Sequence, residues 1–253
     1  MWPRAVMTVA LRGPGKAVLL ASAAGWIALA WLLTDDRVPY SVVAMGHGEH
    51  AASTATRMSH SSGPFLAMWL AMILAMAPPL LLREIGRLWR TSLRRLRLLT
   101  LGWFLCGYVG IWLLAGVAPA MLSGWVTVSA ERMTTAIALV ALWYCSPARQ
   151  RCLNACHRVP TLRVFGMAAQ WDSLRYGVST GWYCVGTCGL AMLLVLLAKD
   201  HHLLGMALVA VVATVERHLP ARRPGWRLPL LRGRSPDWPR MSVANRSTSF
   251  GWQ

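Results

Sequence analysis

Two pairs of cysteines with the same spacing are the residues of this sequence best suited to bind a metal ion. Cys152 and Cys156 lie in the basic segment CLNACHR beside His157, whereas Cys184 and Cys188 lie in the apolar segment GWYCVGTCGLAM. Residues four apart share one face of a helix, with Cβ atoms about 5–6 Å apart. Two sulfurs at that separation can hold one ion, and soft sulfur donors select Cu(I) or zinc over hard cations.

Methionine thioethers add to these donors. Met192 follows Cys188 by one helical turn, and Met68, Met72 and Met76 recur every four residues in the run MWLAMILAMAPP. Residues at this spacing form a stripe on one face of a helix. Buried methionines and free cysteines are also common packing residues. The alternative that all of these sulfurs serve packing therefore stays open.

A further group of soft donors lies between the first two apolar runs of the chain. It contains Met45, His47, His50, Met58 and His60, in a stretch that also holds Gly and Ser. Imidazole and thioether groups suit copper and zinc, and short His-rich tracts often bind metals. We expect this segment to be either a site of metal capture or an ordinary polar loop.

The composition places the chain in a membrane. It is 56% hydrophobic and 14% charged, whereas soluble domains carry about 25% charged residues. The net charge is nevertheless +17, which is typical of an integral membrane protein whose basic residues stay on the cytoplasmic side. A nucleic-acid-binding domain would also be basic, but it would not need several membrane-length apolar runs. We therefore expect the lipid bilayer as a partner and no nucleic acid.

The apolar runs predict the topology. They cover about residues 16–33, 64–82, 98–118, 125–144, 178–198 and 202–215, of which the fourth and sixth are the weakest. Pro78 and Pro79 predict a kink or an end in the second run. Arginines cluster in residues 83–97 and 149–175, which assigns these segments and both termini to the cytoplasmic side. We predict an all-α, polytopic transmembrane helix bundle of about six spans in a bacterial inner membrane.

Three parts of the chain follow from this topology. Residues 1–63 form the first transmembrane helix and the outward Met/His loop, residues 64–220 form a metal-binding-type membrane domain, and residues 221–253 form a basic cytoplasmic tail that we expect to be disordered. On the cytoplasmic side thiols stay reduced, so the even number of cysteines does not predict disulfides.

The sequence carries no pattern typical of an enzyme. It has no Gly-rich phosphate loop followed by Lys-Ser or Lys-Thr. Glu131, Asp172 and Glu216 are scattered and do not form a paired carboxylate site. We expect a protein without catalytic activity.

The order of these motifs resembles the DUF2182 family. The likeness covers about residues 64–220 and runs through MWLAMILAMAPP, GWFLCGYVGIW, ALWYCSPARQRCLNACHR, GVSTGWYCVGTCGLAM and VERHLP. Members are predicted metal-binding integral membrane proteins, some of them linked to copper delivery to secreted or membrane copper enzymes. The resemblance implies that the Met-rich second span, both cysteine pairs, Met192 and Glu216 are the marked positions, together with Gly107, Tyr108, Gly181 and Gly186.

The chain departs from the family pattern at three places. Met76-Ala-Pro-Pro replaces a tighter Met-Met-x-Pro signature, and Arg149 and Arg151 stand where a lysine is common before the first cysteine pair. Thr187-Cys188 replaces two adjacent cysteines, which leaves one sulfur fewer in the fifth span.

Together these features predict a membrane protein that binds a soft transition metal. We expect Cu(I), with zinc as the second candidate, and a copper-accepting protein as a partner. The direction of transfer across the membrane is left open. The rival hypothesis is a metal-free scaffold or assembly subunit, in which the cysteines serve packing and the basic segments contact anionic lipid.

Overall fold

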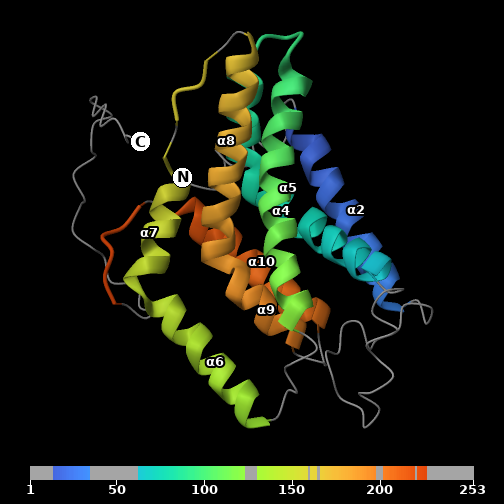
Figure 1. Cartoon of the computed structure of the whole chain (residues 1–253), viewed down its shortest axis with the longest axis vertical. Coiled ribbons are helices and arrows are strands. Elements are labelled where there is room, and N and C mark those ends of the chain that lie inside the picture. Colours follow the sequence, from blue (N-terminus) through green and yellow to red (C-terminus); the bar gives the residue numbers. More distant parts are fainter. Residues whose placement is uncertain are drawn as a thin grey trace.

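The computed structural model describes residues 14–34, 62–122, 130–158, 160–163, 166–197, 202–219 and 221–226, and these residues contain helices and no strand. The helices are α2 (Gly15–Thr34), α4 (Ser62–Thr91), α5 (Arg97–Leu122), α6 (Ala130–Cys145), α7 (Pro147–Cys156), α8 (Gly166–Cys184), α9 (Leu190–Leu197) and α10 (His202–His218), with a π-helical segment η3 (Val185–Gly189) between α8 and α9. The prediction of an all-α fold is confirmed for this part of the chain (Figure 1).

Four of the described helical segments are long and apolar enough to cross a membrane. They cover Gly15–Leu32, Leu66–Thr91, Arg97–Val117 and Gly166–Val195. The fourth and sixth predicted spans correspond to α6 and α10, which have 16 and 17 residues. Both fall short of the roughly 20 residues that a straight helix needs to cross the hydrocarbon core.

The second predicted span continues beyond its expected end. Helix α4 passes through Pro78 and Pro79 and ends only at Thr91, so of the two predicted outcomes, a kink or an end, the prolines do not end the helix. Several apolar residues after them, including Leu81 and Leu88, are buried, and this burial holds the last turns in helical form. Figure 1 shows that α4 changes direction along its length, as expected where proline removes a backbone hydrogen bond.

The fifth predicted span begins twelve residues earlier than expected, at Gly166 instead of Val178. The segment up to Arg175 was predicted as part of a cytoplasmic loop, and this boundary was wrong. Asp172 accepts hydrogen bonds from the Arg163 side chain at 2.8 and 2.9 Å, so its charge is paired. Ala169, Ser173 and Tyr176 are buried, and this packing extends the helix into a polar part of the sequence.

Glycines allow the closest contacts between helices. A Cβ atom at Gly177 of α8 would lie 2.0 Å from the backbone oxygen of Phe104 in α5, and one at Gly107 of α5 would lie 2.5 Å from the backbone oxygen of Leu174. Likewise, a Cβ atom at Gly25 of α2 would lie 2.4 Å from the backbone nitrogen of Ala75 in α4. Small residues at helix contacts are typical of membrane bundles, because they let the backbones approach.

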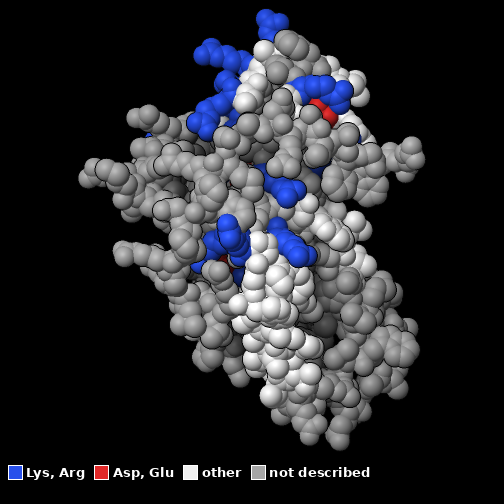
Figure 2. Space-filling model, turned by 90° about the vertical axis from the view of Figure 1, so that its left-hand side faces the viewer, with Lys and Arg blue, Asp and Glu red and all other residues white. Residues whose placement is uncertain are grey.

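Apolar and basic residues are separated on the outside of the bundle. Several leucines and valines on α5, α6 and α10 are more than half exposed, for example Leu114, Leu139 and Val211, as expected of faces that contact lipid. Figure 2 shows Lys and Arg gathered over the upper end of the molecule and in a band about half way down, above a part whose described residues are drawn white because they are neither basic nor acidic. The side of the membrane on which the arginines lie stays a prediction from the sequence.

Candidate metal centre

The cysteine pair of the fifth predicted span lies at a local change of helix type. Cys184 is the last residue of α8, and Cys188 lies within the π-helical segment η3. Single π turns inside α-helices are rare and often occur at functional sites. The two Sγ atoms are 3.9 Å apart, and each residue is only 1% exposed. Metal–sulfur bonds are about 2.3 Å long for zinc, so one ion could contact both sulfurs at this separation.

Hydrogen bonds orient the two sulfurs. The Cys188 thiol donates to the backbone oxygen of Cys184 at 3.0 Å, and the Tyr108 hydroxyl of α5 donates to the Cys184 Sγ at 3.3 Å. Cys188 is therefore held as a thiol, while Cys184 already has a donor that would stabilise a thiolate. Tyr108 is 1% exposed and reaches the sulfur because Gly181 lets α8 approach the backbone of α5.

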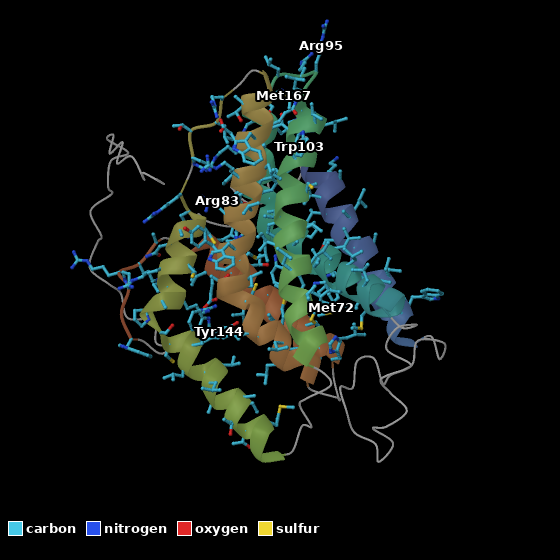
Figure 3. The ribbon with its side chains drawn as sticks, in the orientation of Figure 1. Met72, Arg83, Arg95, Trp103, Tyr144 and Met167 are labelled. Carbon is cyan, nitrogen blue, oxygen red and sulfur yellow. The ribbon has the colours of Figure 1, made fainter. Side chains whose placement is uncertain are left out.

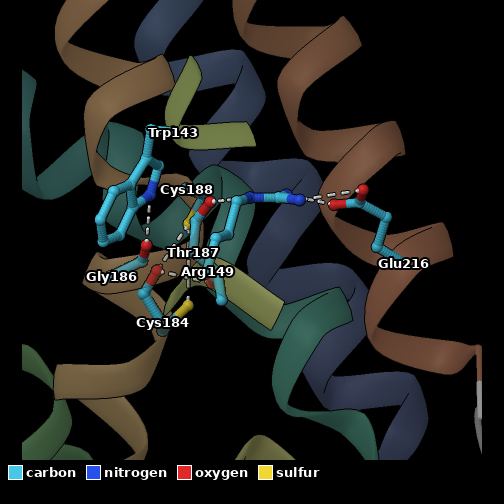
Figure 4. Close-up of polar contacts among 7 residues, drawn as sticks. All are labelled: Trp143, Arg149, Cys184, Gly186, Thr187, Cys188 and Glu216. Atoms are coloured by element: carbon cyan, nitrogen blue, oxygen red, sulfur yellow. Dashed lines mark hydrogen bonds and ion pairs between the residues drawn. The ribbon is translucent and has the colours of Figure 1, made fainter. Parts of the chain in front are cut away.

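The backbone of η3 is tied to three other helices (Figure 4). Trp143 Nε1 of α6 donates to the Gly186 oxygen at 2.9 Å, and Arg149 Nε of α7 donates to the Thr187 oxygen at 3.0 Å. Both remaining nitrogens of this guanidinium group donate to the Glu216 carboxylate of α10. These bonds use backbone oxygens at a π turn, where the regular ladder of the α-helix is interrupted.

Two small cavities meet at Cys188. One lies on the side of α4 and is lined by the thioethers of Met76 and Met192 together with Tyr108 and Trp112. The other is lined by Cys184, Arg149, Glu216 and Arg217, and Cys188 contributes to both. Cys188 therefore borders both a mainly apolar space that methionines line and a space that charged residues line.

The Met stripe of α4 is buried. Met68, Met72 and Met76 are each at most 3% exposed and belong to the same core as Cys184, Cys188 and Met192. Only Met76 lines the cavity beside Cys188. Figure 3 places Met72 in the lower half of the molecule, well away from Arg95 at its upper end.

The first cysteine pair, on α7, lies next to the second. A Cβ atom at Gly186 of η3 would lie 3.1 Å from the Cys152 Sγ, so Cys152 packs directly against the π turn. The Cys156 Sγ accepts a hydrogen bond from Arg217 Nη1 at 3.5 Å. Burial raises the pKa of the Cys156 thiol to about 12, although the Arg217 charge opposes this rise.

His157 follows the pair at the C-terminal end of α7. Burial lowers the pKa of its imidazole, and the nearby Arg83 and Arg217 charges lower this pKa further. The side chain therefore favours the neutral form, which is the form that binds metals.

The described part of the chain does not assemble every predicted ligand. It contains no group of three or more His, Cys, Asp or Glu side chains placed to hold a metal ion, so His157 is not joined to a cysteine cluster. The predicted outer-loop ligands His47, His50 and His60, with Met45 and Met58, lie outside the described residues. What the structure brings together is two thiols, flanked by two thioethers and by buried charges.

Several residues of this site were not predicted as site residues from the sequence. Arg149 was noted only as a departure from a family pattern, and Glu84, Trp143 and Arg217 were not considered. A charged residue in or next to an apolar run has a high desolvation cost unless it is paired. Such a residue in a sequence therefore indicates a candidate site residue. Glu84 lies in the described span Leu66–Thr91, and Arg217 lies in the last turn of the apolar helix α10.

The fold and the donors together define an all-helical protein with membrane-type helices and a buried, sulfur-rich centre. A family described as PpoB2, copper chaperone, matches residues 66–229, which is more than half of the chain. The chain therefore belongs to this family of copper chaperones. No curated protein matches the chain significantly, and no solved structure does. Membership of this family supports copper handling in general.

Proposed function

We propose that the protein binds Cu(I) within the membrane at Cys184 and Cys188 and exchanges it with a copper-accepting protein. The observation that carries this proposal is the pair of buried Sγ atoms 3.9 Å apart, within reach of one ion. Cu(I) is the soft monovalent ion that thiolate and thioether donors prefer. Copper is the cargo of the protein in this proposal, and zinc is the second candidate.

Transfer would proceed by ligand exchange along the two cavities. Met76 and Met192 hold the ion weakly as neutral thioethers on the α4 side, and Cys188 then replaces one of them because it lines both cavities. Binding displaces the thiol protons, since metals bind the thiolate form. The Tyr108 hydroxyl keeps donating to the Cys184 sulfur after its proton has left.

In this scheme, Cys152 and Cys156 on α7 bind the ion after Cys184 and Cys188. Cys152 packs against Gly186, which lies between the two intramembrane cysteines in the sequence, so its sulfur would be the next donor for an ion that leaves Cys184 or Cys188. Met68 and Met72 extend the thioether route along α4, and His157 lies one residue beyond Cys156. The Met/His segment with His47, His50 and His60 would capture copper on the outer face of a bacterial inner membrane, and the protein would have no catalytic activity.

The test is to count metal in the purified protein. The parent protein and the variant Cys184→Ala/Cys188→Ala are purified in detergent under reducing conditions, loaded with Cu(I) and challenged with a moderate chelator. The parent is expected to retain about one copper per chain and the double variant to lose it. The variant should remain folded, because the lost side-chain volume costs only about 1–2 kcal/mol.

The matched control is Cys106→Ala, which removes an exposed thiol of α5. This variant should bind copper like the parent. If the parent retains neither copper nor zinc, the proposal fails and the metal-free scaffold explains the buried sulfurs better.

A further inference from the structure

Arg217 is a buried cation whose hydrogen-bonding capacity is only partly used. The residue is 5% exposed and lines the charged cavity together with Cys184 and Cys188. Its Nη2 atom donates to Glu84 Oε1 at 3.1 Å, and its Nη1 atom donates to the Cys156 Sγ at 3.5 Å. Within the described residues, neither Arg217 Nε nor Glu84 Oε2 has a hydrogen-bond partner. Buried polar atoms of this kind are rare and call for a physical reason.

The other arginine of the cavity differs in this respect. Arg149 donates from Nε to the Thr187 oxygen and from both remaining nitrogens to Glu216. It also lies over the Tyr144 ring, with Cζ 3.7 Å from the ring centroid. Each of the three guanidinium nitrogens of Arg149 therefore has a partner, and these contacts hold η3 to α10. Among the described residues, Arg217 is the arginine of this cavity that has a nitrogen without a partner.

The effect of the Arg217 guanidinium group on metal binding depends on the charge of the bound ion. Two thiolates with a monovalent ion carry a net charge of −1, whereas two thiolates with a divalent ion are neutral. An uncompensated charge in a buried site is costly, so the monovalent complex needs a nearby positive charge. Arg217 lines the cavity and its partner Glu84 does not. The guanidinium group therefore borders the space that the two thiols also line, whereas the carboxylate does not.

We propose that Arg217 determines the metal specificity of this site. Its guanidinium group compensates the negative charge of a Cu(I)–dithiolate at Cys184 and Cys188 and gives no such advantage to a Zn(II)–dithiolate. Glu84 limits the strength of this effect, because its negative charge offsets part of the positive charge that Arg217 presents to the cavity. This inference rests on the proposed function, since it assumes that the two thiols bind the ion.

The test compares two substitutions that break the same ion pair from opposite sides. Arg217→Gln removes the positive charge, so it should weaken Cu(I) binding at least tenfold relative to Zn(II). Glu84→Gln removes the opposing negative charge, so it should shift the same ratio toward Cu(I). The affinities are measured on the full-length protein in detergent, by competition of Cu(I) alone and Zn(II) alone with chromophoric chelators. If the ion pair only stabilises the fold, both substitutions will weaken both metals in the same direction, and the inference is overturned.

Two further variants keep the test decisive if a single substitution disturbs folding. Arg217→Lys retains the charge and should retain the parent's preference for Cu(I). The double variant Arg217→Gln/Glu84→Gln leaves no unpaired charge and should lie between the two single variants. If the parent does not bind Cu(I) at all, the proposed function fails as well. If the parent binds Cu(I) but Arg217→Gln leaves the ratio unchanged, only the role of Arg217 is refuted.

Discussion

Among the described glycines, Gly177 is the one where an added methyl group should reduce the stability of the fold most. In the structure, a Cβ atom there would lie 2.0 Å from the backbone oxygen and 2.9 Å from the backbone carbon of Phe104. Tight contacts of real Cβ atoms stay beyond 3.0 Å. The substitution Gly177→Ala therefore requires α5 and α8 to separate by about 1 Å at this point.

The cost can be placed at the upper end of the range for overpacking. Extra volume in a packed core costs about 1–3 kcal/mol, and here the obstacle is backbone that cannot change rotamer. We expect a loss of about 3 kcal/mol in the free energy of unfolding. The separation also moves the Tyr108 hydroxyl away from the Cys184 sulfur, now 3.3 Å distant. Copper retention should therefore fall together with stability.

The matched control is Gly110→Ala on α5. A Cβ atom there meets nothing within 4 Å, so the substitution should be neutral or stabilising by up to about 1 kcal/mol through helix propensity. Both variants are compared with the parent by reversible unfolding in detergent micelles. Equal stability of the two alanine variants would show that α5 and α8 do not touch at Gly177. The placement of Tyr108 over Cys184 would then be wrong.

Two other predictions concern charges and thiols near the metal centre. Glu216→Gln leaves the buried Arg149 without its carboxylate partner. Because Glu216 is itself partly exposed, we expect a loss of about 2 kcal/mol in the free energy of unfolding, which is less than for a fully buried pair. The double variant Arg149→Gln/Glu216→Gln should recover part of this loss, as measured by thermal unfolding. The Cys156 thiol has its pKa raised to about 12 by burial, so its alkylation rate in the folded protein should keep rising above pH 9, where an ordinary thiol levels off. Because the folded state favours the protonated thiol, this residue contributes stability that is present below about pH 9 and is lost as the pH rises toward 12. A rate that levels off near pH 9, measured by mass spectrometry of the alkylated peptide, would contradict the buried environment of Cys156.

The sulfur donors were predictable from the sequence because their spacing carries the information. Residues four apart share a helix face whether the helix is buried or exposed, and this rule alone pairs Cys184 with Cys188. The apolar runs likewise predicted the helices that contain Met68–Met76 and Gly177–Cys188. Their boundaries were less accurate, since burial of Tyr176 and of Leu88 extends α8 and α4 into polar segments.

The charged half of the site could not be predicted in this way. Arg217 pairs with Glu84 across 133 residues of sequence, and Arg149 pairs with Glu216 across 67. No local spacing relates such partners, because they meet only when α4, α7 and α10 pack together. The sequence rule that could have flagged them is the cost of a charge beside an apolar run, which identifies the residues but not their partners.

The π turn explains how one long helix keeps both cysteines facing the bundle. The buried stripe of α8, η3 and α9 contains residues 169, 173, 176, 177, 180, 181, 184, 187, 188, 191, 192 and 195. From Ala169 to Val195 this stripe makes seven turns in 26 residues, whereas seven turns of ideal α-helix need about 25. A regular helix would therefore rotate its last turns away from α5 and α4. The π turn at Val185–Gly189 takes up the extra residue, so that Cys188 and Met192 continue the face that Gly177 and Cys184 begin.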